Sequence, residues 1–206
     1  MTGWMTKPLA WLKHQPEQRL MVILAIVVGL GSGAAAVVLK KLIELIGGCL
    51  TGWFDASWNN LLLLVYPGVG MLLSLLFVRY VVRDDIGHGV TKVLFSISRN
   101  NSRIRSHNMW SSLLSSSVTI GFGGSVGAEA PIVYTGAAIG SNVARSLGLS
   151  YRQMTILLCC GAAGAVAGIF KAPMAGILFC LEILLFNISM SSILPLLLSS
   201  VTATTV

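Results

Sequence analysis

The sequence predicts an all-α integral membrane protein with broken and re-entrant helices, forming a single membrane domain over residues 1–206. Hydrophobic residues make up 55% of the chain, charged residues make up only 10%, and the mean hydropathy is +0.83. A soluble domain of 206 residues would carry more charge on its surface. The 22 glycines are the third observation, because glycine permits close helix packing and unusual backbone angles.

The net charge of +7 does not indicate a nucleic-acid partner. Lysine and arginine lie at the ends of apolar runs, without the basic stripe interleaved with aromatic residues that nucleic-acid binding uses. Positive residues gather before the first apolar run and after the second, which predicts a cytoplasmic N-terminus. We therefore expect an integral protein of the plasma membrane that keeps its first apolar segment.

The first spanning helix is expected over residues 20–39, which carry no charge. This length matches the ~20 residues that a helix needs to cross the hydrocarbon layer. Lysines and a glutamate follow it, so we expect the helix to continue past the membrane surface toward residue 48. The spacing of Gly29 and Gly33 permits close packing on a neighbouring helix.

The second span is expected over residues 61–78, interrupted early by Pro67. After it, residues 83–93 break the helical pattern with a Gly-His-Gly sequence. The stretch that follows is too short and too polar to cross the membrane. We expect a re-entrant half-helix there.

A serine-rich segment over residues 107–119 leads into GFGGSVGAEAPIVYTGAAIG, residues 121–140. The glycines of this stretch allow unusual backbone angles and close approach. A helix of small residues is expected over residues 132–148, with Gly136 and Gly140 on one face. Gly148 suits the C-terminus of this helix.

The C-terminal third is expected to hold another helix start near Ser150 and a broken apolar run over residues 154–186. Two helices should meet at residues 170–173, because Pro173 suits the first turn of the second helix. Residues 193–206 fall short of the about 18 residues of a spanning segment and end without a polar flank. We expect the chain to be the first part of a longer protein.

The four cysteines lie in or beside apolar segments and lack the spacing of metal ligands. We expect buried thiols rather than disulfides or metal ligands at Cys49, Cys159, Cys160 and Cys180.

Broken helices at membrane depth should line a cavity or be covered by protein, because lipid offers the backbone no hydrogen bonds. Two such helix starts are predicted, at residues 87–89 and at residues 127–131. Free N–H groups and the positive end of the helix dipole attract an anion there without a full positive charge. Transporters use discontinuous helices in this way. The pattern therefore predicts anion transport.

Glu129 is the single carboxylate within residues 121–140 and stands at the second helix start. When it is ionised it can occupy the place of the anion, and it can leave that place when it is neutral or swings away. An ionisable residue in a membrane segment indicates function by default. The alternative is a simple capping acid at a helix start.

The sequence at these positions resembles the CLC family of chloride channels and proton-coupled chloride exchangers. GSVGAEAP is similar to the family's G-K/R-E-G-P signature, and GHGV is similar to its G-S-G-I-P loop. The stretch GAAGAVAGIFKAPMAGILFCLEILL resembles a helix pair of the family with an A-P-x-A-G-x-L-F-x-x-E core. The matches run in the family's order over roughly residues 16–206, and the last of them is the most specific.

The resemblance implies one half of a CLC-type inverted-repeat fold, with this chain as the first repeat. It also implies a homodimer with one pathway in each subunit, chloride as the bound and transported ion, and protons as a possible second substrate. Glu129 then takes the position of the gating glutamate. The expected anion-binding residues are Gly87, His88, Gly89, Ala130, Pro131 and Ile132.

Several residues depart from the family's pattern. His88 replaces a serine whose hydroxyl contacts the anion, and a histidine can donate from either ring nitrogen. Ala128 and Ala130 replace a basic residue and a glycine beside the gate. Ile183 stands where exchangers commonly carry a second, proton-handling glutamate, which resembles the channel pattern. Proton coupling through water or another route stays open.

Two further charged residues are possible accessory residues. Lys171 at the break between two helices can attract anions or pair with an acid, or its ammonium group can simply reach the interface. Glu182 matches an acid that the family shares widely, and a structural role as a hydrogen-bond acceptor is the favoured interpretation.

A different class of function is an intramembrane serine hydrolase, because GGSVG fits the G-x-S-x-G turn around a nucleophilic serine. That chemistry needs a base near Ser125, and His14, His88 and His107 all precede it in polar or loop segments. A non-transporting fragment that only packs against another half is the third alternative. No metal and no organic cofactor are expected.

Overall fold

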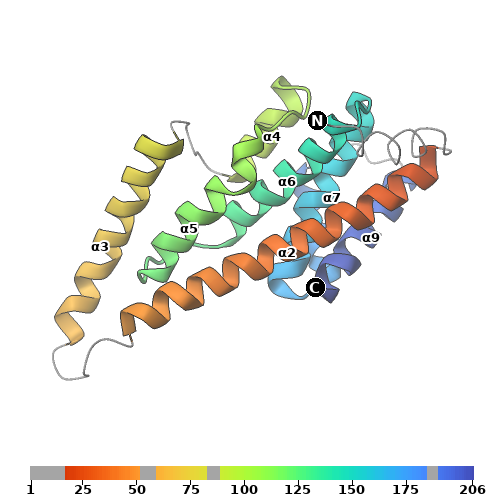
Figure 1. The fold of residues 1–206 in the computed structure, drawn as a ribbon. Helices are drawn as coiled ribbons and strands as arrows, with labels where there is room; N and C mark the ends of the chain where they lie inside the picture. Colours follow the sequence, from red (N-terminus) through yellow and green to blue (C-terminus); the bar gives the residue numbers. More distant parts are fainter. Residues whose placement is uncertain (1–16, 52–58, 83–88, 185–189) are drawn as a thin grey trace, which may run out of the picture.

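The computed structural model describes residues 17–51, 59–82, 89–184 and 190–206. Within these ranges every regular element is helical, as predicted (Figure 1). The α-helices are α2 (Glu17–Thr51), α3 (Asn59–Phe77), α4 (Gly89–Arg99), α5 (Ser111–Gly121), α6 (Glu129–Ser146), α7 (Tyr151–Phe170), α8 (Pro173–Phe179) and α9 (Met190–Thr205). A 3-10 turn, η2 (Ser106–Met109), and two π-helical turns, η1 (Val78–Val82) and η3 (Cys180–Leu184), connect or extend them.

Three described segments are long and apolar enough to cross a membrane: Glu17–Leu50, Val65–Val82 and Tyr151–Phe170. The first contains the predicted span and continues well past it, as expected. By contrast, α4 has 11 residues, which at 1.5 Å each reach about 16 Å and fall short of the ~30 Å hydrocarbon layer. The predicted half-helix is therefore present as a short helix, while most of the break before it lies outside the described residues.

The predicted interruption of the second span at Pro67 was wrong. Pro67 lies inside α3 and does not interrupt it. A membrane helix tolerates a proline because local adjustment and neighbouring groups satisfy the backbone carbonyl that loses its partner. By contrast, the start of α6 at Glu129 agrees with the helix start predicted at residues 127–131, and Pro131 fits its first turn, where the missing N–H costs nothing.

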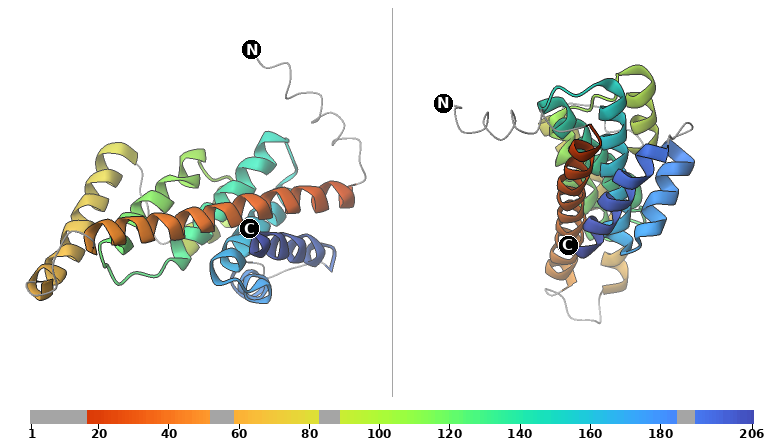
Figure 2. Two further views of the ribbon diagram at one scale, coloured as in Figure 1. Left: turned by 60° about the horizontal axis from the view of Figure 1, so that its bottom comes forward. Right: turned by 90° about the vertical axis from the view of Figure 1, so that its right-hand side faces the viewer.

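Helix α7 is the centre of the fold, with 78% of its span buried among α6, α2 and α9 (Figures 1 and 2). It meets α6 backbone to backbone. A Cβ atom at Gly136 would overlap the carbonyl oxygen of Gly161, and one at Gly140 would overlap that of Leu157. The predicted small-residue face of α6 therefore packs on α7, and no larger side chain fits between them.

A second seam joins α2 to α9, and it uses the glycine pair predicted for close packing. A Cβ atom at Gly29 would lie 2.6 Å from the carbonyl oxygen of Ser199, and one at Gly33 would lie 2.7 Å from that of Ala203. The Ser199 hydroxyl is fully buried and donates a hydrogen bond of 2.7 Å to the Cys160 carbonyl on α7. This bond ties α9 to the central helix.

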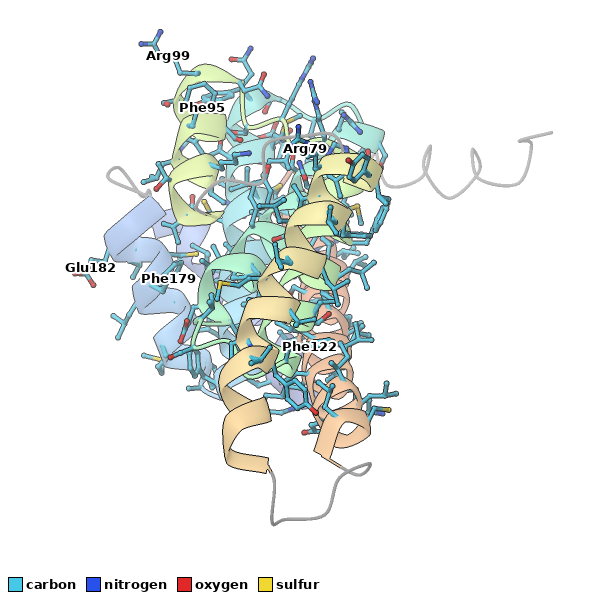
Figure 3. All side chains as sticks on the ribbon, turned by 90° about the vertical axis from the view of Figure 1, so that its left-hand side faces the viewer. Arg79, Phe95, Arg99, Phe122, Phe179 and Glu182 are labelled. Atoms are coloured by element: carbon cyan, nitrogen blue, oxygen red, sulfur yellow. The ribbon has the colours of Figure 1, made fainter. Side chains whose placement is uncertain are left out.

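Helix α3 stands at the edge of the fold, where only 6% of its span is buried (Figure 1). It packs on α5 through two small residues one turn apart. A Cβ atom at Gly70 would overlap the Cβ atom of Phe122, which lies beside α3 in Figure 3. The Ser74 hydroxyl lies 2.7 Å from the Ser115 hydroxyl and donates to the Ser115 carbonyl at 3.2 Å. These contacts link α3 to the end of α5.

The predicted break points in the C-terminal third are confirmed. Ser150 caps α7 in a reciprocal capping box with Gln153. At the other end, Lys171 adopts a left-handed conformation with φ of 53° and stops α7. Pro173 then occupies the first turn of α8. Helix α6 also ends as predicted, with Gly148 at a φ of 63°.

The cysteine prediction holds for three of the four thiols. Cys159, Cys160 and Cys180 are buried and free, whereas Cys49 is exposed. The prediction of a buried Cys49 was wrong because the last turns of α2 extend beyond the other helices that bury its middle part (Figure 1).

The backbone contact between α6 and α7 makes a testable prediction for Gly136→Ala. Alanine normally stabilises a helix by up to about 1 kcal/mol relative to glycine. At Gly136 the added methyl group meets the Gly161 carbonyl, so we expect stability to fall by about 1–3 kcal/mol. Thermal unfolding in detergent measures this. The matched control is Gly48→Ala in α2, where a Cβ atom meets nothing within 4 Å and stability should hold or rise. Equal melting temperatures for the two variants would contradict the packing argument.

Candidate functional site

The starts of α4 and α6 meet in the structure. Gly89 is the first residue of α4 and is buried. A Cβ atom there would overlap the carbonyl oxygen of Ala130, the second residue of α6, and would lie 2.8 Å from its carbonyl carbon. The contact is therefore backbone to backbone. It brings together two helix N-termini, each with the positive end of a helix dipole.

The first turn of α6 has free N–H groups. Its cap residue, Ala128, makes no side-chain hydrogen bond to the helix. Pro131 has no N–H to offer, and the N–H of Ile132 donates to the Ala128 carbonyl at 3.2 Å. The N–H groups of Glu129 and Ala130 have no acceptor among the described residues. Of the predicted cradle, Ala130 is thus the residue whose N–H is available to an anion.

The side chain of Ile132 belongs to the core, and only its backbone was expected to face an anion. It is fully buried in an apolar cluster with Leu39 and Leu113. Ile132 therefore holds α6 against α2 and α5, and its N–H serves the helix. The sequence pattern that marked residues 130–132 as one group did not separate these roles.

Glu129 is exposed and folds back over the loop that precedes it. A Cβ atom at Gly127 would overlap Oε2 of Glu129 and would lie 3.2 Å from its Cδ. Its carboxylate has no hydrogen-bond or ion-pair partner among the described residues, and it does not cap the helix. The carboxylate is therefore free to move over the helix start, where it can compete with an anion for the same N–H groups.

Two of the predicted site residues, Gly87 and His88, lie outside the described residues. Gly89 is the one member of the predicted Gly-His-Gly loop that the structure describes. Its contact with Ala130 joins the two helix starts predicted from sequence. The part played by His88 stays a prediction.

The two accessory residues lie apart from this junction. The Lys171 ammonium donates a hydrogen bond of 3.1 Å to the Thr204 carbonyl, so it pairs with the last turn of α9. Glu182 is exposed on η3 and points outward at the edge of the molecule in Figure 3. Neither contacts the start of α6 in the described residues. No hydrogen-bond donor to Glu182 is found among the described residues, so its favoured role as a structural acceptor stays a prediction.

The geometry does not assemble a serine hydrolase site in the described residues. Ser125 follows α5, whereas His107 precedes it in η2. They lie in the segments at opposite ends of α5, whose 11 residues reach about 16 Å, and no hydrogen bond between them is present in the described residues. A general base must approach within about 3 Å of the serine hydroxyl. His14 and His88 lie outside the described residues.

No cluster of three histidine, cysteine, aspartate or glutamate side chains could hold a metal ion within the parts of the chain that the structure describes. The expectation of no metal and no organic cofactor stays a prediction.

Sequence reasoning missed a buried polar chain beside the two helix starts. Asn108 donates from Nδ2 to the Tyr134 hydroxyl at 3.0 Å, and Ser111 donates to Oδ1 of Asn108 at 3.3 Å. Tyr134 lies one helical turn after Ala130, so it shares the face of α6 that contacts α4. That spacing was the available signal. Nothing in the sequence pairs Asn108 with it.

Comparison with known proteins gives one family match, described as voltage gated chloride channel, over residues 69–206. A ClcB-like chloride channel protein of Ralstonia nicotianae is 30% identical over 150 residues, covering 71% of this chain and 34% of the relative. An H(+)/Cl(-) exchange transporter ClcA of Vibrio vulnificus is 26% identical over 205 residues, covering 94% of this chain and 43% of the relative.

Solved structures give the same fold. A slow cyanobacterial Cl-/H+ antiporter aligns with a TM-score of 0.73 at 22% identity, over 90% of this chain and 45% of its own. A CLC-type fluoride/proton antiporter aligns with a TM-score of 0.74 at 27% identity, over 92% of this chain and 46% of its own. The chain thus spans less than half the length of each of these four proteins and forms half of their fold.

If an anion binds where the two helix starts meet, chloride should stabilise the protein against thermal unfolding, and the substitution Gly89→Ala should weaken this effect. A ligand that binds the native state raises its stability, so chloride should raise the melting temperature of the wild type relative to gluconate, which is too bulky for the site. Alanine at Gly89 forces the two helix starts apart and should reduce that difference. The control, Gly68→Ala, adds a methyl group in open space and should keep it. A full chloride effect in Gly89→Ala would count against an anion site at this junction.

Proposed function

Because the chain belongs to the voltage-gated chloride channel family, an integral membrane family, we propose that it forms part of a chloride pathway gated by Glu129. In this proposal the starts of α4 and α6 hold the anion between them, with Gly87, His88 and Gly89 on one wall and the start of α6 on the other. The contact between Gly89 and the Ala130 carbonyl is the observation that carries it.

The electrostatic reason lies in the direction of both helices. Each presents its N-terminus to the junction, and each N-terminus carries about half a positive charge. The free N–H groups of Glu129 and Ala130 add directional donors. Partial charges and N–H groups bind an anion without the strong grip of a lysine or arginine, so the ion can also leave, as conduction requires.

Glu129 supplies the gate in this scheme. Its carboxylate is attached at the helix start, so it competes there with the permeant anion when it is ionised. Protonation, or rotation of the side chain toward open space, vacates the position. The glycine at position 127 leaves room for the carboxylate, which lies where a Cβ atom of residue 127 would be. No side chain of residue 127 has to move first.

Channel and exchanger mechanisms remain two forms of this proposal, and the relatives include proteins named for each. Ile183, in place of a second glutamate, favours the channel. One solved relative is named as a fluoride/proton antiporter, so the preferred halide is a separate question from the presence of a pathway.

We further propose a homodimer in the plasma membrane with a cytoplasmic N-terminus, on the basis of the family resemblance and the distribution of positive residues.

The decisive experiment is anion flux from proteoliposomes that contain the protein in its natural full length, with internal pH recorded at the same time. We expect chloride efflux. Uphill proton movement driven by the chloride gradient would select the exchanger, and chloride flux without proton movement would select the channel. The absence of flux of chloride and fluoride alike would overturn the proposal and favour a non-transporting role.

Replacing the gate tests Glu129 directly. The substitution Glu129→Gln keeps the size of the side chain and removes its charge, so the site can no longer be closed by an ionised carboxylate. We expect chloride flux that no longer depends on pH, and no coupled proton movement. Flux at several pH values measures both. The control is Glu44→Gln, which removes an exposed carboxylate from the outer part of α2. A Glu129→Gln protein with wild-type pH dependence and coupling would remove Glu129 from the gating role.

A further inference from the structure

Tyr134 occupies the contact between the two helix starts. It lies one turn after Ala130 on α6 and is only 5% exposed. Its Cβ atom would lie 3.3 Å from a Cβ atom at Gly89, so the side chain of Tyr134 and the Ala130 carbonyl together form the surface that receives the start of α4. Tyr134 also shares a buried apolar cluster with Val93 of α4, so its side chain fills the interface between α4 and α6 as well as bordering the contact at Gly89.

The hydroxyl group of Tyr134 is held by a buried polar chain. It accepts a hydrogen bond of 3.0 Å from Nδ2 of Asn108, whose Oδ1 accepts one of 3.3 Å from Ser111. Asn108 is 4% exposed and Ser111 is fully buried. Burying such groups is costly unless they are hydrogen-bonded. The chain therefore specifies one position for the ring, which a plain apolar contact would leave less defined.

The segment that precedes Asn108 is also bound to α6. Ser141 donates to the Ser102 carbonyl at 2.7 Å and accepts from the Ile104 N–H at 3.0 Å. These bonds hold the loop that leads into η2, which carries Asn108. Asn108 therefore cannot follow small displacements of the Tyr134 ring, because the segment before it is bound to α6 at Ser141, about two turns beyond Tyr134.

We propose that Tyr134 is a positioning residue that sets the spacing of the two helix starts and thereby the discrimination between anions of different size. The inference rests on the proposed function of this junction. Tyr134 acts through Gly89 and Ala130 and needs no contact with the ion. Discrimination by size depends on how well the site resists a small change in its width. The buried chain from Ser111 through Asn108 supplies that resistance.

The test compares fluoride, chloride and nitrate flux in proteoliposomes of the full-length protein. Tyr134→Phe keeps the ring and removes the acceptor for Asn108. A hydrogen bond worth about 1 kcal/mol corresponds to about a fivefold change in an equilibrium ratio, so we expect the chloride-to-nitrate flux ratio to fall by about that factor. The triple variant Tyr134→Phe, Asn108→Leu and Ser111→Ala removes all three members of the described chain, so that none of them is left buried without the partner it had there, and it should fold while showing the same loss of discrimination.

The matched control is Ser199→Ala, which removes another buried side-chain hydrogen bond, between α9 and α7. It should lower the amount or stability of active protein without changing flux ratios. A merely structural role of Tyr134 would give the same result, an equal loss for every anion, and would overturn the inference. So would unchanged ratios in both Tyr134 variants. If the wild type carries no anion, the proposed function fails first. If the wild type is active and the ratios do not move, only the role of Tyr134 fails.

Discussion

The close approach of backbones to helix α6 is the constraint on which the rest of the structure depends. The start of α4 rests on its first turn at Ala130, and α7 rests on it further along at Gly136 and Gly140. The nearest atoms at these contacts are backbone carbonyl oxygens, so the contacts cannot be relieved by a change of rotamer. The helix is therefore fixed along its length, and its first turn, with the free N–H groups and Glu129, is fixed with it.

The same contact explains why an alanine is acceptable beside the carboxylate. The family resemblance would place a glycine at Ala130, which suggests a need for close approach. In this structure the space is provided by the partner, Gly89, while Ala130 contributes its carbonyl oxygen. A methyl group at residue 130 is compatible with the junction because it lies off the contact. The close contact needs a glycine at only one of its two residues, and either helix can supply it.

Local chemistry predicted much of this fold. The stop of α7, the proline at the start of α8 and the cap at Ser150 follow from residues that act within one turn of themselves. The errors arose where distant partners decide. Pro67 lies in a continuous helix, and Cys49 is exposed because the last turns of α2 extend beyond the helices that bury its middle. The pairing of Asn108 with Tyr134 joins segments that no sequence period relates, so it required the three-dimensional structure.

Helix α3 adds a mechanical aspect to the site. Few of its residues are buried, and it contacts α5 at Ser115 and at Phe122, the residue that follows the end of α5. The loop that carries Glu129 begins at that residue. Any element that packs on the exposed face of α3 is therefore connected to the start of this loop through Phe122. A tilt of α3 would act on Phe122 directly, and through it on the residues that lead to Glu129.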